Sequence, residues 1–326
     1  MATDMAFCSR NLLQMPLIFF ESLLKLLDPK DILSISKTCL YLESLCKDQK
    51  YWRKLEFNVK SLLYESDHCE YVTKEFAERG LVEFIVHYTR EEENLNFTGV
   101  DTTIQQIIGL LPPSIENLHI PIFMLSNANI SLSSLESKPN LKSLQLGEHL
   151  LEFGDFRIWE QKNESIKDLL NSLFTKLKNL ESVSIQDCHG ILRKPLLNLS
   201  INNKHLKELD MSYCWSLDRS GLSSISQFND LETLKLISCG IDDEDMKLLC
   251  EGCKKVISFD VSWSSITNDS LVLITKNMTE IQDLNIIGCY GITHEGILGL
   301  LSSGLLLKKL YIRQAFITTF DFAFLT

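Results

Sequence analysis

The nine residues LETLKLISC, from Leu231 to Cys239, contain the pattern that decides the fold. Leucines occupy the first, fourth and sixth positions, and a cysteine follows three residues after the last leucine. The same frame begins at residues 180, 206, 256, 281 and 307, with Ser264 and Ala315 in the cysteine position of the frames at 256 and 307. Successive starts lie 26, 25, 25, 25 and 26 residues apart, so this region is an array of repeats.

The second half of each repeat has helical spacing. After Cys239, apolar side chains follow at Ile241, Met246, Leu249 and Cys253. A short alternating segment followed by a period near 3.6 predicts a strand, a turn and a helix in every unit. One unit cannot bury its apolar side alone, whereas a stack of units can. The sequence therefore predicts an α/β solenoid with a parallel concave sheet and convex helices.

The frame also continues upstream of residue 180. It fits at Ile115 and Leu141, and because the starts at 141 and 180 lie 39 residues apart, we expect an insertion, at residues 151–165. A still earlier unit is expected at Leu95, Phe97, Ile104, Ile107 and Leu111. We expect about eight repeats in a domain covering residues 92–326. Because FDFAFLT lacks a polar cap, the chain is either shortened or folds back there as its own cap.

These units resemble the cysteine-containing class of leucine-rich repeats. The phrases ISCGIDDEDMKLLCEGC (237–253) and IIGCYGITHEGILGLLSSG (286–304) carry the resemblance, which covers roughly residues 92–315. The resemblance implies a scaffold that binds a protein partner.

Residues 12–55 have the pattern of three short helices. Asp28 is suited to cap a helix, Pro29 to its first turn, and Asp31 to the positive end of the helix dipole. Residues 56–91 show mixed helical periodicity and are expected to form a helical linker that joins the two modules rigidly.

The N-terminal segment resembles the F-box. The positions that match its spacing are Pro16, Leu27, Asp28, Pro29, Asp31, Ile32, Leu33, Cys39, Leu45, Asp48 and Trp52. Ile18 stands where an acidic residue is usual, and Leu42 stands where a tryptophan is common. An F-box followed by leucine-rich repeats is itself a family arrangement. It implies a substrate-recognition subunit of a cullin-RING ubiquitin ligase, in which the F-box docks on the Skp adaptor.

Docking on an adaptor requires apolar side chains that face outward, and three short helices hold more of them than they can bury. Some of the candidates must nevertheless be internal core. The candidate adaptor-binding residues are Pro16, Phe20, Leu23, Leu24, Ile32, Leu33, Ile35 and Trp52.

Composition narrows the partners and the compartment. A net charge of −11 and a pI of about 5.2 argue against a general phosphate-binding surface, so a nucleic-acid partner is not expected. The stretch Leu17–Leu27 contains Glu21 and Lys25 and is too short to cross a membrane. Ten cysteines in a long chain with no secretory signal indicate reduced thiols and a cytoplasmic or nuclear location.

Residue types that could carry chemistry are better explained by structure. The repeat cysteines are expected to turn inward and satisfy backbone groups, and Cys250 and Cys253 form a CxxC without the second pair that zinc requires. Cys188 and His189 are adjacent on a strand and so point to opposite faces. The run at residues 242–245 compensates a helix dipole. We expect no catalytic residue, metal or cofactor.

The side chains between the anchoring leucines remain available for binding, because strand alternation places them on the concave face. Aromatic residues at the strand ends are typical of binding hot spots, although the tryptophans could equally pack over the turns of their own repeats. The acidic members favour a partner segment containing lysine or arginine. The candidate substrate-binding residues are Glu208, Asp210, Tyr213, Trp215, Lys235, Ile237, Asp260, Trp263, Asp283, Ile287, Tyr290, Tyr311 and Arg313.

Two other functions stay open. The chain could be a leucine-rich-repeat scaffold or inhibitor unconnected with ubiquitin, in which residues 1–90 only cap the solenoid. An enzyme with an internal active site is the third alternative, and the sequence shows no constellation for it.

Overall fold

The computed structural model describes most of the chain. The described residues are 22–24, 26–27, 29–38, 40–46, 48–88, 97, 99–121, 132–147, 157–186, 188, 192–215, 217–312 and 320–321. Among them, no helix is both long enough and apolar enough to cross a membrane.

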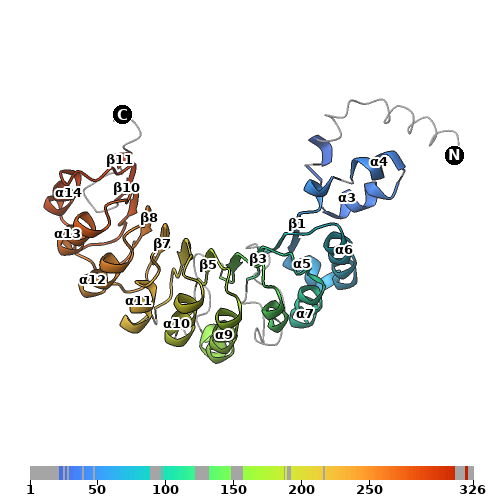
Figure 1. The fold of residues 1–326 in the computed structure, drawn as a ribbon, viewed down its shortest axis with the longest axis horizontal. Helices are drawn as coiled ribbons and strands as arrows, with labels where there is room; N and C mark the ends of the chain where they lie inside the picture. Colours follow the sequence, from blue (N-terminus) through green and yellow to red (C-terminus); the bar gives the residue numbers. More distant parts are fainter. Residues whose placement is uncertain are drawn as a thin grey trace.

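The described strands form one continuous sheet in chain order. The strands β1 to β10 pair in parallel, each with the next, and β11 closes the edge antiparallel to β10. Their bounds are β1 Lys54–Asn58, β2 Glu83–His87, β3 Asn117–His119, β4 Ser143–Gln145, β5 Ser182–Ser184, β6 Glu208–Asp210, β7 Thr233–Lys235, β8 Ser258–Asp260, β9 Asp283–Asn285, β10 Lys309–Tyr311 and β11 Phe320–Asp321. Figure 1 shows the sheet lining the inside of an arc.

Helices cover the outside of the same arc (Figure 1). They are α5 Val59–Tyr64, α6 Ser66–Glu78, α7 Val100–Leu110, the 3-10 helix η4 Ser133–Ser137, α9 Arg157–Lys176, α10 Arg193–Asn202, α11 Arg219–Ile225, α12 Asp243–Gly252, α13 Asn268–Asn277 and α14 His294–Leu301. At one end of the arc lie α3 Pro29–Ser36, α4 Leu40–Leu45 and the 3-10 helix η1 Gln49–Tyr51. The predicted α/β solenoid with a concave parallel sheet and convex helices is confirmed.

The repeat frame builds the core. In the unit that begins at Leu231, the anchors Leu231, Leu234 and Leu236 are fully buried between the sheet and the helices. Each such side chain contributes about 1.5 to 3 kcal/mol on burial. The central residue of each three-residue strand is buried and its two neighbours face the concave side, so a unit exposes two strand residues to solvent.

The predicted domain boundaries are wrong at the N-terminal side of the solenoid. Residues 56–91 are not a helical linker. They contain β2 and the last residues of β1, and both strands belong to the common sheet. The repeat frame was present in the sequence, at Trp52, Leu55 and Phe57 and again at residues 81, 84 and 86. Longer helical segments separate these units, which obscured the period. The solenoid therefore begins near residue 52 rather than 92.

The other upstream predictions are partly correct. In the early unit, Ile104 and Ile107 lie buried on α7 as expected, but its strand is β2. Leu95 lies outside the described residues. The expected insertion overlaps the first turns of the 20-residue helix α9. At the C-terminus, the pairing of β11 with β10 agrees with a segment that folds back on the last repeat.

Buried polar side chains join successive repeats. The Cys239 thiol donates to the carbonyl oxygen of Met211 at 3.0 Å, and the Cys214 thiol donates to that of Ile185 at 3.1 Å. The amide of Asn203 accepts a hydrogen bond from the backbone N–H of Leu180 and donates to a carbonyl oxygen of the turn after α9, both at 2.9 Å. Each bond satisfies a backbone group that the stack removes from water.

Trp52 attaches the N-terminal helices to the first repeat. Its indole N–H donates to the carbonyl oxygen of Cys46, after α4. Its ring meets Phe76 of α6 edge-on, with 4.9 Å between ring centroids. The Arg79 guanidinium lies 4.3 Å from the centre of the same ring. The two parts of the chain thus share one core at this junction.

Candidate protein-binding face

The concave strands present the predicted candidates side by side. The register pairs Glu208 with residue 233, and Asp210 with Lys235, so these residues form rows across the sheet. Glu208, Lys235 and Tyr311 are exposed, and Asp260 and Asp283 are half-buried. Arg313 lies outside the described residues. The described strand members therefore lie along the same side of the sheet, and their role in binding stays a prediction.

Hydrogen bonds within the face hold several of these side chains in place. Asp210 accepts a bond from the backbone N–H of Ser212 at 3.0 Å and one from the Gln186 amide at 2.9 Å. Asp260 likewise accepts from the backbone N–H of residue 262 at 3.0 Å and from the Asn285 amide at 2.7 Å. Both aspartates therefore brace the turn after their own strand as well as facing solvent. Sequence reasoning had assigned them only to binding.

Lysines partly neutralise the row of carboxylates. The Lys235 ammonium lies 3.7 Å from Asp210, and that of Lys309 lies 3.6 Å from Asp283. Among the described residues, no lysine or arginine forms an ion pair with Glu208 or Asp260. The face therefore carries an excess of negative charge.

Aromatic side chains gather where the concave strands end, at a rim formed by Trp215, Trp263 and Tyr290. All three are exposed, Trp263 at 54% and Tyr290 at 74%. The rings of Trp263 and Tyr290 meet edge-on with centroids 6.3 Å apart. Tyr213, Ile237 and Ile287, also predicted, lie half-buried beside the rim. Trp263 therefore touches the neighbouring turn and still offers open aromatic surface.

The rim is built on backbone that bulky residues rarely adopt. Tyr213, Ser238, Trp263 and Gly288 occupy the same position of successive repeats, and all have a positive φ, between 56° and 75°. A left-handed conformation costs a residue other than glycine about 1 to 2 kcal/mol. The exposed indole of Trp263 is thus held at an energetic cost by the surrounding turn. Strain of this kind concentrates at binding sites.

The cysteines lie beneath this face and are structural. Burial raises the pKa of the Cys239 thiol to about 12 and that of Cys289 to about 11. Burial also raises the pKa of Cys250 and Cys253 to about 12 each, and the Cys253 thiol points at a carbonyl oxygen 3.7 Å away. In the part of the chain that the structure describes, no group of three histidine, cysteine or acidic side chains could hold a metal ion.

The acidic run at the start of α12 has two roles. Asp242 and Asp245 form a capping box, in which each side chain accepts a backbone N–H of the other. Asp243 instead accepts hydrogen bonds from the backbone and hydroxyl of Thr267, at 2.9 and 2.8 Å, and from Ser270. Burial alone would raise the pKa of Asp243, but these hydrogen bonds hold it below its ordinary value. The predicted dipole role therefore accompanies a link between repeats.

The sequence of one repeat identifies the type of solenoid. Residues 202–226 match the family described as Leucine Rich repeat. This one repeat is therefore similar to leucine-rich repeats. The rest of the array follows the same frame, from the unit at Trp52 to that at residue 307.

Two solved structures are similar to this chain. The crystal structure of a TLR13–ssRNA13 complex has 16% identity and a TM-score of 0.42, covering 83% of this chain and 38% of that one. The crystal structure of the Rad7 and Elc1 complex in yeast has 13% identity and a TM-score of 0.34, covering 97% of this chain and 95% of that one. The present chain thus spans well under half the length of the first. No curated protein matches the sequence.

The predicted adaptor-binding residues do not all face outward. Leu24, Ile32, Leu33 and Trp52 are buried in the core that the N-terminal helices share with the first repeat, so these four are the candidates that form internal core, as was expected for some of the set. The physical reason is that α3 packs against α4 and against α6 of the first repeat, so these side chains join the core of the solenoid. Leu23 and Ile35 are half-buried, and Pro16 and Phe20 lie outside the described residues.

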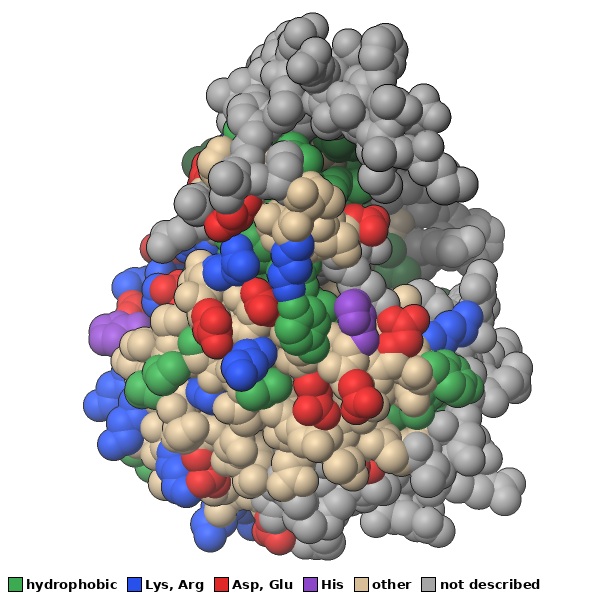
Figure 2. All heavy atoms as spheres, turned by 90° about the vertical axis from the view of Figure 1, so that its right-hand side faces the viewer, with side chains coloured by type: hydrophobic (Ala, Val, Ile, Leu, Met, Phe, Trp, Pro, Cys, Tyr) green, Lys and Arg blue, Asp and Glu red, His purple; other side chains and the backbone are tan. Residues whose placement is uncertain are grey.

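Leu26 is the exposed apolar residue that the prediction missed. It is 83% exposed and borders a depression of about 560 Å³ between the N-terminal helices and the first strands. Leu27, Tyr51 and His87 also line this depression. The viewing direction of Figure 2 is onto this end of the arc, where apolar, acidic and basic side chains are interspersed. In the sequence, Leu26 belongs to the run LLKLL at residues 23–27, and the structure places it in the turn after the helical residues 22–24.

Proposed function

We propose that this protein is a non-catalytic, substrate-recognition subunit of an SCF-type ubiquitin ligase. In this role the N-terminal helices dock on the Skp adaptor, and through it on a cullin-RING ligase, while the concave face of the repeats binds a protein substrate. The F-box resemblance of residues 12–55, followed by leucine-rich repeats, motivates the proposal.

The observation that carries the proposal is the junction at Trp52. A ligase subunit must hold its substrate at a fixed distance from the adaptor, and a shared core transmits position better than a flexible linker. The N-terminal helices are joined to the solenoid through Trp52, Phe76 and Arg79. Beside this junction, Leu26 leaves an apolar side chain in solvent that an adaptor helix would cover.

Adaptor binding tests the proposal directly. The full chain is co-expressed with the Skp adaptor and isolated through a tag on the adaptor. The double variant Leu23→Asp with Leu26→Asp should reduce recovery at least tenfold, because both changes place charge in the proposed contact. Tyr64→Asp is the matched control, since Tyr64 is 73% exposed on α5, outside that contact. Failure of the unaltered chain to bind, or equal recovery of the double variant, would falsify the proposal.

The second candidate is a scaffold or inhibitor without a ubiquitin role. One observation favours it: α3 packs against α6 of the first repeat, at the end of the arc where a terminal cap of the solenoid would lie (Figure 1). Under this alternative the chain binds its concave partner but no adaptor. The co-expression experiment therefore separates the two.

A further inference from the structure

A depression on the concave face follows from a local change in side-chain size. The two concave side chains of β5 are Ser182 and Ser184. The register places Glu208 and Asp210 beside them on β6, and Ser143 and Gln145 beside them on β4. These small residues beside the larger Glu208, Asp210 and Gln145 leave a notch of about 180 Å³, which we call the β5 notch. It is much larger than the roughly 30 Å³ of a water molecule and smaller than the roughly 300 Å³ at which small-molecule pockets begin.

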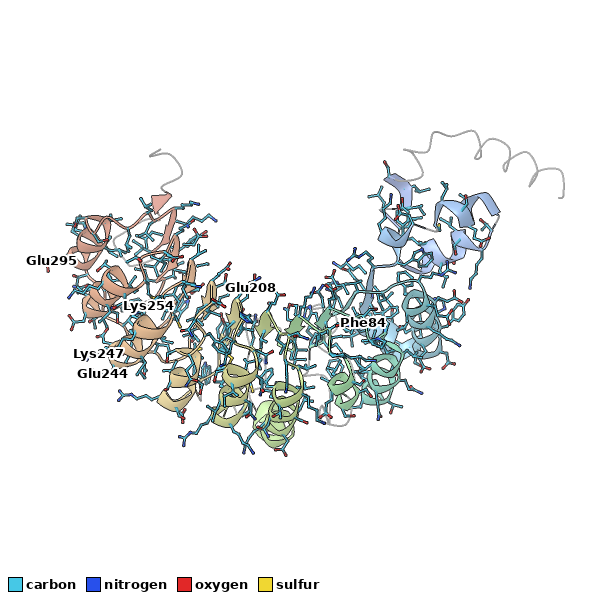
Figure 3. The ribbon with its side chains drawn as sticks, viewed as in Figure 1. Phe84, Glu208, Glu244, Lys247, Lys254 and Glu295 are labelled. Atoms are coloured by element: carbon cyan, nitrogen blue, oxygen red, sulfur yellow. The ribbon has the colours of Figure 1, made fainter. Side chains whose placement is uncertain are left out.

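Carboxylates form one wall of the β5 notch. Glu208 accepts a hydrogen bond from the Ser182 hydroxyl at 3.0 Å, and no described lysine or arginine forms an ion pair with it. Asp210, behind it, is already held by the Gln186 amide and lies 3.7 Å from Lys235. Figure 3 shows Glu208 reaching from β6 into the hollow of the arc. The uncompensated charge at the notch is therefore that of Glu208.

The floor of the notch offers a further acceptor. The hydroxyl oxygen of Ser184 is buried and has no hydrogen-bond partner. A buried hydroxyl without a partner costs about 1 to 3 kcal/mol. A donor entering the notch gains a bond with Ser184, after rotation of its side chain, without displacing an existing one. The lining thus combines the carboxylates of Glu208 and Asp210, the serine hydroxyls and the amides of Gln145 and Gln186. It also includes the Lys235 ammonium, which is paired with Asp210 and leaves Glu208 uncompensated.

We propose that the β5 notch receives a lysine or arginine side chain from an extended segment of a protein bound on the concave face. The inference rests on the proposed role of that face in binding a protein. The volume fits one side chain, the carboxylates exclude an anion, and the hydroxyl and amide groups suit a hydrogen-bond donor better than an apolar group. The negative charge of the whole chain, −11, attracts a basic segment from a distance.

Selection from a phage-displayed library of random 12-residue peptides tests the inference with the full chain. Enriched peptides should contain a lysine or arginine at one fixed position. Replacing that residue by glutamine should weaken binding at least fivefold, and Glu208→Gln should do the same. For the peptide in which glutamine replaces the basic residue, Glu208→Gln should cause no further loss of binding, because the two changes remove the same ion pair. Ser182→Leu, which fills the notch, should also abolish the preference.

Glu295→Gln is the control for charge alone, since Glu295 lies on α14 on the outer side of the arc (Figure 3) and the change alters net charge equally. It should leave peptide binding unchanged. The inference is overturned if no peptide is enriched, if enriched peptides lack a fixed basic residue, or if Glu208→Gln binds as tightly as the unaltered chain. Adaptor co-expression reports separately on the ubiquitin role, because Glu208 lies far from the N-terminal helices along the arc (Figure 3).

Discussion

The indole of Trp263 lies directly over the backbone of Gly288, the residue that occupies the same turn position in the next repeat. A Cβ atom at residue 288 would come within 2.7 Å of two ring carbons of Trp263. Gly288 also has a φ of +75°. The rim of the concave face therefore depends on one repeat having glycine where the preceding repeat has tryptophan.

Gly288→Ala should destabilise the chain and displace Trp263. The added methyl group meets the indole, and the left-handed backbone adds strain of about 1 to 2 kcal/mol. Urea unfolding should show a lower free energy of unfolding, and tryptophan fluorescence should shift in the folded state. Gly240→Ala is the matched control, because Gly240 has a φ of +72° but no atom within 4 Å of an added Cβ. Equal losses in the two variants would show that contact with Trp263 is unimportant.

Asn203→Ala should cost about 2 to 4 kcal/mol, because it leaves two buried backbone groups, the N–H of Leu180 and the carbonyl of Leu177, without partners. Urea unfolding followed by circular dichroism measures the loss. Asn277→Ala serves as the control, since the Asn277 amide donates only to Leu273 of its own helix. A loss below that of the control would mean that water replaces the amide of Asn203.

Stability should decline in mild acid because of His119. Burial, aided by the nearby His87, lowers the pKa of His119 from 6.5 to about 4. The folded state therefore resists protonation that the unfolded chain accepts, so stability is full above pH 6.5 and falls as the pH drops toward 4. His119→Gln should flatten this part of the stability curve, as measured by urea unfolding at several pH values. An unchanged slope would assign the acid sensitivity to other groups.

Trp52 should control how firmly the N-terminal helices are attached. Trp52→Ala removes the ring contacts with Phe76 and Arg79 and should cost about 3 to 5 kcal/mol. Trp52→Phe keeps most of the packing and loses the hydrogen bond to Cys46, a change of about 1 kcal/mol. Limited proteolysis should release the N-terminal helices in the alanine variant well before the phenylalanine variant. Equal cleavage rates would indicate that the junction is held elsewhere.

The strongest sequence signals correspond to the most regular structure. The frame at Leu231 predicts strand β7 and its buried anchors. It does so because a 25-residue period arises when the same packing of strand against helix recurs in every unit. The first two units have the same anchors, at Trp52 and Leu81, but their longer helical segments broke the period. Sequence alone therefore placed the start of the solenoid at residue 92, some forty residues after the observed start near residue 52.

Sequence by itself determined the repeat, the concave position of residues such as Glu208 and Trp263, and the inward direction of the cysteines, because these depend on periodicity along one strand or helix. Only the tertiary structure decided that Asp210 and Asp260 brace turns, that Leu24 and Trp52 are core, and that a notch lies between β4 and β6. These properties depend on which side chains of neighbouring repeats meet. Such contacts are fixed by register and packing across the sheet, which a single repeat does not specify.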